Sequence, residues 1–122
     1  MADEITYSLF LSLANSNRAV SRATGNLTID QTGTDYVSGT MNVATSAEAI
    51  PKGDITTPGM MLVHNLEAKG GNYVEIGHDD GGFKVGVKVS GGRYGLFECA
   101  QAVPQWKADT AAVDVEYIML EA

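Results

Sequence analysis

Three pairs of adjacent glycines divide residues 59–102 into segments of similar length. The pairs occupy positions 70–71, 81–82 and 91–92. Because glycine has no Cβ, it adopts positive φ without a steric clash, and each pair therefore allows the backbone to turn sharply. The segments between and after the pairs are rich in β-branched and aromatic residues and about one strand long. They comprise residues 72–77, 83–89 and 93–100. This spacing predicts a β-meander, in which consecutive strands are joined by tight turns.

The middle segment shows the clearest alternation between apolar and polar positions. Side chains alternate between the two faces of a strand, so residues two apart share a face. The apolar set is Phe83, Val85, Val87 and Val89, and the other set is Lys84, Gly86 and Lys88. We therefore expect a half-buried antiparallel strand with the apolar set facing a core.

The rest of the chain is also organised as short strands and turns. Alternating patterns predict further strands at residues 5–13, 27–30, 35–45 and 113–120. Residues 60–66 are apolar on both faces, as a strand in the middle of a sandwich should be. Residues 18–23 are compatible with a short strand or a single helical turn, and the hairpin-like opening favours the strand. Residues 15–17 are expected to turn the chain within an N-terminal hairpin. Residues 50–59 and 102–110, which contain all three prolines, are expected to be loops, the first of them a surface loop or a crossover between sheets.

About eight or nine strands result, with no helical period among them. The sequence therefore predicts an all-β fold in which two antiparallel sheets form a jelly-roll-like β-sandwich, or a flattened barrel. No linker or internal repeat divides the chain, so we expect one domain over residues 1–122. A chain of this length, 44% hydrophobic, can bury a single core.

Charge, the N-terminal apolar run and the single cysteine indicate which partners and environments to expect. The chain has 15 acidic and 8 basic residues and a net charge of −7, so it would repel phosphates, and we expect no direct nucleic-acid partner. Polar residues interrupt the apolar run at residues 5–13, which is therefore expected to be neither a signal peptide nor a membrane span. The single cysteine, Cys99, lies among apolar residues and is expected to be a small buried side chain.

The sequence contains no catalytic motif. It has no Gly-x-Ser-x-Gly, no Cys–His constellation and no glycine loop of the kind that cradles phosphate before a helix. We therefore expect no enzymatic activity, no catalytic residues and no cofactor. His64 shares a predicted strand face with Leu62 and Leu66 and is expected to be a core or edge histidine.

One acidic cluster has the composition of a cation site. It consists of Glu75, His78, Asp79 and Asp80. Carboxylates and an imidazole can hold a divalent cation. However, Asp80 precedes Gly81, and Asp-Gly is a frequent hairpin turn. We favour the turn and predict no metal, although the sequence alone leaves the metal open.

Two aromatic residues are candidate partner contacts. Phe10 is the one large apolar residue on the second face of the first predicted strand. Trp106 lies in a predicted loop beside Pro104, where it can anchor a partner or close one end of the sandwich, and we favour closure. A long, weakly charged edge strand needs a cover, which its own chain or another subunit can supply. We expect a homo-oligomer, either a trimer or a dimer.

Several segments taken together resemble a known group of proteins. The segments are Gly53-Asp-Ile-Thr-Thr-Pro-Gly, Leu62-Val-His-Asn-Leu, Tyr73-Val-Glu-Ile-Gly, Lys107-Ala-Asp-Thr-Ala-Ala-Val and Glu116-Tyr-Ile. Their order resembles small β-rich proteins encoded in the structural modules of tailed bacteriophages. The likeness covers roughly residues 29–121 and consists of turns and strands, so it transfers no functional residue.

The resemblance implies a virion component, most plausibly a head-decoration or capsid-cement protein bound to the major capsid protein. Its location would be the capsid exterior, after assembly in the host cytoplasm. Two alternatives stay open: a structural component of the tail or neck, and a carbohydrate-binding β-sandwich module.

Overall fold

The computed structural model describes residues 5–14, 19–31 and 33–122, which contain twelve strands and no helix. The chain divides into two compact units, Met1–Gly33 and Thr34–Ala122. The sequence predicts one sandwich over residues 1–122, whereas the sandwich lies entirely within the second unit. The first unit forms two-stranded sheets of its own.

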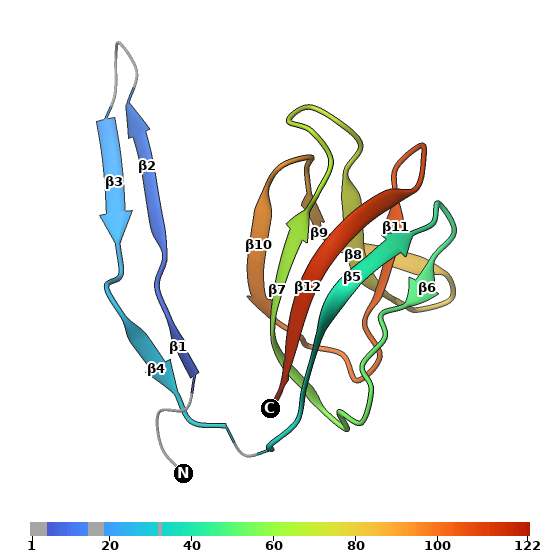
Figure 1. Cartoon of the computed structure of the whole chain (residues 1–122), viewed down its shortest axis with the longest axis horizontal. Helices are drawn as coiled ribbons and strands as arrows, with labels where there is room; N and C mark the ends of the chain where they lie inside the picture. The colour runs from blue at the N-terminus through green and yellow to red at the C-terminus, as the bar shows by residue number, and fades with distance from the viewer. Residues whose placement is uncertain (1–4, 15–18, 32) are drawn as a thin grey trace. The chain divides into compact units, whose positions relative to one another are not determined.

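The second unit consists of two four-stranded antiparallel sheets (Figure 1). The first sheet has the order β10-β7-β12-β5, and the second has the order β6-β11-β8-β9. The first contains β5 (Tyr36–Val43), β7 (Pro58–Asn65), β10 (Tyr94–Glu98) and β12 (Val113–Glu121). The second contains β6 (Glu48–Ala49), β8 (Val74–Asp79), β9 (Phe83–Val89) and β11 (Gln105–Ala108). This strand order is that of a jelly roll, so the predicted all-β, jelly-roll-like sandwich is confirmed.

Side chains from both sheets form one core. On β12, alternate residues from Val113 to Met119 are buried, as the period of a strand with one covered face requires. Trp106 of β11 meets Tyr117 of β12 edge-on across the sandwich, with ring centroids 5.2 Å apart. The Tyr117 hydroxyl donates a hydrogen bond of 2.9 Å to the carbonyl oxygen of Pro51, which fixes the crossover between β6 and β7. A crossover between sheets was one of the two predictions for residues 50–59.

The glycine pairs are turns, as predicted, but they do not join a meander. Gly70, Gly81 and Gly92 have positive φ, at 84°, 69° and 76°. Within the second unit only β8 and β9 pair as consecutive neighbours, whereas the turns before β8 and after β9 pass to the other sheet. The prediction of a meander is therefore wrong. A flexible turn permits the chain to reverse, but it does not specify which sheet the next strand joins.

The predicted buried face of β9 is also incorrect. Val89 is buried, whereas Val85 and Val87 are 55% and 43% exposed. The register of β8 and β9 shifts after Ile76, which breaks the two-residue alternation. In addition, β9 lies at the edge of its sheet, where cover from the other sheet is incomplete.

The structure has more strands than the predicted eight or nine. Residues 105–108 form β11 where the sequence predicts a loop, because Trp106 and Ala108 alternate toward the core while the strand pairs with β8. The predicted first strand is divided into β1 (Ile5–Tyr7) and β2 (Phe10–Ala14). Two residues (8–9) separate β1 from β2, whereas three residues (24–26) separate β3 from β4 on the facing side of the ribbon. The extra residue forms a bulge at Gly25, whose φ is 67°.

The first unit is a two-stranded ribbon, here named the arm (β1 to β4). β1 pairs with β4 (Leu27–Ile29), and β2 pairs with β3 (Ala19–Ala23), so the strand pairing of the predicted N-terminal hairpin is confirmed. The predicted turn at residues 15–17 lies outside the described residues. Every residue of β2 and β3 is exposed. A two-stranded ribbon buries too little apolar surface to be stable alone in water.

A matched pair of glycines tests the close contact between β8 and β9. The carbonyl oxygen of Lys84 occupies the space that a Cβ at Gly77 would need, whereas the corresponding space at Gly39 is open. We expect Gly77→Ala to destabilise the sandwich by about 1–3 kcal/mol or more, because the backbone must move. Gly39→Ala should change stability by less than about 1 kcal/mol. Urea unfolding measures both, and equal effects would contradict the described contact.

Candidate interaction surface

The outer face of the β10-β7-β12-β5 sheet carries an apolar row across three of its strands. Register places Leu96 of β10 opposite Leu62 of β7, and Leu62 opposite Ile118 of β12. The first two side chains are half-buried, and Ile118 is 38% exposed. Directly opposed residues lie on the same face of a sheet. The three therefore form a continuous apolar surface, named here the apolar row, on the side turned away from the core.

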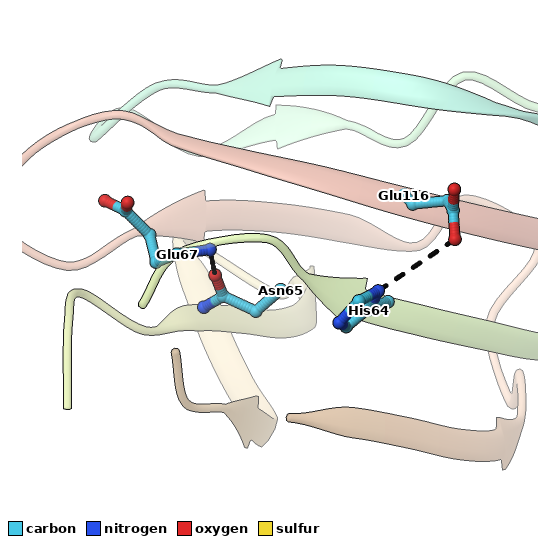
Figure 2. A network of polar contacts seen from close by, with 4 residues as sticks. All are labelled: His64, Asn65, Glu67 and Glu116. Carbon is cyan, nitrogen blue, oxygen red and sulfur yellow. Dashed lines mark hydrogen bonds and ion pairs between the residues drawn. The ribbon is translucent and has the colours of Figure 1, made fainter. Parts of the chain in front are cut away.

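A second row on this face combines an aromatic pair with an acid. The rings of His64 and Tyr94 stack with centroids 3.9 Å apart and an interplanar angle of 7°. Nδ1 of His64 lies 3.9 Å from Oε1 of Glu116 on the neighbouring strand (Figure 2). Because the Glu116 side chain is 60% exposed, this contact adds little stability. The prediction of a core or edge position for His64 is wrong, since it lies on the outer face of a central strand.

Asn65, the next residue, points into the core. Its Nδ2 donates hydrogen bonds of 2.9 Å to the carbonyl oxygens of Asn72 and Val89. Its Oδ1 accepts a hydrogen bond of 2.9 Å from the N–H of Glu67 (Figure 2). The side chain is fully buried, and these bonds satisfy it. Asn65 therefore joins the end of β7 to the segments that enclose β8 and β9.

The two predicted contact residues lie in opposite environments. Phe10 in β2 is 71% exposed, and register places it opposite Ala23 on a face that otherwise carries small residues. Its contact role stays a prediction. Trp106 is fully buried, and its indole N–H has no hydrogen-bond partner among the described residues. Its position in the core is consistent with closure of the sandwich and removes it from the surface.

Asp79 and Asp80 of the acidic cluster form the hairpin turn, whereas Glu75 and His78 lie within β8. Oδ1 of Asp79 accepts a hydrogen bond of 2.8 Å from the N–H of Gly82, and the N–H of Asp80 donates to the carbonyl oxygen of Gly82 at 2.9 Å. Across the residues that the structure describes, no group of three or more His, Cys, Asp or Glu side chains is placed to hold a metal ion.

A small apolar hollow of about 240 Å³ opens beside β8, β9 and β10. Ile76, Val87, Phe97 and Cys99 are among its lining residues. Ligand pockets generally exceed about 300 Å³ and contain several convergent polar groups. This hollow is smaller than that range, and its lining combines these apolar side chains with His78, Glu98 and Gln101.

The shifted pKa values of the cysteine and two tyrosines disfavour ionisation near neutral pH. Burial raises the pKa of the Cys99 thiol and of the Tyr117 hydroxyl. The nearby charge of Asp109 and a hydrogen bond to it raise the pKa of Tyr73. A nucleophile is activated by a lowered pKa or by an adjacent base. The pKa of each of these three groups is therefore raised, whereas activation as a nucleophile requires a lowered pKa.

Glu121 fixes the start of the second unit. Its Oε1 accepts hydrogen bonds from the N–H groups of Thr34 at 3.1 Å and Asp35 at 3.4 Å, and its Oε2 accepts one from Thr56 at 3.0 Å. The backbone donors, that of Thr56 first, lower the pKa of Glu121. The carboxylate thereby attaches the segment before β5 to the last strand.

Sequence reasoning missed several of these residues. Asn65 had a usable signal, because it is a polar side chain on the inward face of an otherwise apolar strand. The stacking of His64 on Tyr94 had none, since the two meet only after β10 pairs with β7.

Comparisons with known proteins identify no relative, so the functional argument depends on the residues described above. No family model, no curated protein and no solved structure matches this chain. Among the described residues, none forms a helix with the length and hydrophobicity required to cross a bilayer.

Asn65→Asp tests the buried amide. An ionised carboxylate cannot donate to the carbonyl oxygens of Asn72 and Val89, and its charge would be buried. We expect a loss of about 2–4 kcal/mol in the free energy of unfolding. As a control, Asn42→Ala removes an exposed hydrogen bond to Asp114 and should cost less than about 1 kcal/mol. Urea unfolding distinguishes them, and a loss for Asn65→Asp no larger than the control would contradict the network.

Glu121→Gln tests the hydrogen bonds of the Glu121 carboxylate through the pH dependence of stability. Because the native pKa of Glu121 lies below the unfolded value, its stabilisation is complete above about pH 4.3 and is lost as pH falls through the lower native pKa. The glutamine variant cannot titrate there. We expect it to be less stable than the wild type at neutral pH and the difference to shrink in acid. Chemical unfolding across this pH range measures the effect, and a constant difference would contradict it.

Proposed function

We propose that this chain is a non-catalytic structural protein of a tailed-bacteriophage virion that decorates the head by binding the major capsid protein. The observation that carries the proposal is the arm, in which all residues of β2 and β3 are exposed although several are large and apolar. Such a ribbon needs a protein partner, because exposed apolar surface of this kind is normally covered.

The second unit (Thr34–Ala122), named here the body, has the properties that a binding scaffold requires. Its eight strands form a jelly roll around one core, and this fold is used in viral capsid domains as well as in lectins and cupins. The fold alone therefore does not select the function. The phage assignment is supported by the likeness of the segments between residues 29 and 121 to small phage structural proteins.

Mechanically, a decoration protein adds buried contact area between neighbouring capsid subunits. A rigid sandwich transmits force between the points that it contacts, and the added area opposes separation under internal pressure. The net charge of −7 keeps the remaining outer surface soluble. The head exterior, reached after synthesis in the host cytoplasm, is the location consistent with this role.

Particle composition tests the proposal. We expect purified phage particles to contain the chain at a near-constant, stoichiometric ratio to the major capsid protein. Particles assembled without it should release DNA at a lower temperature, and adding the purified protein should restore resistance. Absence of the chain from purified particles would refute the virion role.

The same measurement separates the alternatives. A ratio far below that of the capsid protein would place the chain in the tail or neck. If the chain is absent from particles, binding on a glycan array would favour the carbohydrate module, whereas an array without hits would exclude it.

A further inference from the structure

We propose that the arm of one copy packs, through its apolar face, against the outer face of the β10-β7-β12-β5 sheet of a second copy. This inference concerns how the chain assembles with itself. It assigns the apolar face of the arm to a second copy, so capsid binding would use the surface of the resulting oligomer. It is tested separately from the phage assignment, with the pure protein.

The arm has one apolar and one small, polar face. Register in β2 and β3 places Leu13 opposite Val20 and Leu11 opposite Arg22 on one face. In β1 and β4, Tyr7 lies opposite Leu27. Leu11 is 73% exposed, so the centre of this face lacks a cover. The opposite face of β2 and β3 carries Phe10 among small residues, namely Ser12, Ala14, Ala19, Ser21 and Ala23.

Arg22 disfavours an oligomer in which the apolar faces of several arms pack against one another. Packing apolar arm faces together would bring one arginine from each copy into the same desolvated interface. The sequence between residues 5 and 29 contains two arginines and no carboxylate, so the paired strands around Arg22 provide no counter-charge of their own. Unpaired charges of the same sign are strongly unfavourable where water is excluded.

The body provides what the arm lacks. Twelve of the 15 acidic residues of the chain lie in the second unit, and the other three, Asp3, Glu4 and Asp30, flank the strands of the arm in sequence. On the outer face of the first sheet, the apolar row is flanked by the exposed carboxylates of Glu98 and Glu116. An apolar ribbon with a central cation and an apolar row with acids on either side are complementary in polarity and in charge.

The contact area favours reciprocal exchange. From Ile5 to Ala14 the arm is ten residues long, so one ribbon face measures roughly 34 Å by 10 Å, or about 340 Å². Stable interfaces bury about 800 Å² per partner. A chain that both donates and receives an arm contributes about twice the area of one face, which approaches this requirement. We therefore expect each copy to do both, in a closed symmetric oligomer.

Self-association of point variants provides the first test. We expect the full-length protein to be oligomeric by light scattering and analytical ultracentrifugation. Leu11→Lys should weaken association by about ten-fold or more, because it removes a buried leucine and adds a second cation. Ile118→Lys should do the same from the receiving side. Two controls, Ser12→Lys on the opposite arm face and Val85→Lys on β9, should associate as the wild type does.

Disulfide trapping identifies which surfaces meet. In a Cys99→Ser background, a Leu11→Cys chain and an Ile118→Cys chain are mixed and oxidised. We expect a cross-linked heterodimer to form faster than a homodimer of Leu11→Cys chains, and a Ser12→Cys chain should not replace the Leu11→Cys chain. Circular dichroism of each variant confirms that the strands are retained.

Several results would overturn the inference. A monomeric wild type would refute exchange between copies, and an oligomer unaffected by Leu11→Lys or Ile118→Lys would show that other surfaces associate. Preferential cross-linking of two Leu11→Cys chains would establish an arm bundle instead. In a chain carrying both cysteines, a disulfide confined to one molecule would place the arm on its own body.

Discussion

The buried amide of Asn65 is the interaction on which the arrangement of the sandwich depends. Its side chain bonds to Asn72 and Val89, while its backbone bonds to Gly92 and Arg93. These partners lie just before β8, at the end of β9 and in the turn that leads to β10. One residue thus satisfies the polar groups at the place where the chain passes between the sheets. Buried carbonyl groups without such a donor would each oppose folding.

This internal arrangement leaves the outer face of the first sheet available. The core is complete without Leu62, Leu96 and Ile118, which face away from it. Their apolar surface therefore lies outside the core of the sandwich. The arm has the same property to a greater degree, because it has no core of its own. Apolar surface that folding does not use is typical of contact surfaces between proteins.

The candidate surface was only partly predictable. Phe10 was predicted as a partner contact because it interrupts the alternation of its strand, and it is exposed, whereas the predicted loop position of Trp106 concealed a side chain in the core. Neither prediction identified the apolar row. Leu62, Leu96 and Ile118 belong to three separate segments, and only strand pairing makes them neighbours. A single sequence does not contain that pairing.

The sequence by itself determined the class of fold, the positions of most turns and the N-terminal hairpin. These features follow from local chemistry: side-chain alternation defines strands, and glycine permits the positive φ that turns need. Only the tertiary structure decided the jelly-roll order, the division into arm and body, and which face of each strand is covered. Those properties depend on pairing between distant segments and on register shifts such as the one at Gly77. Their free energy comes from contacts that form only when the whole chain has folded.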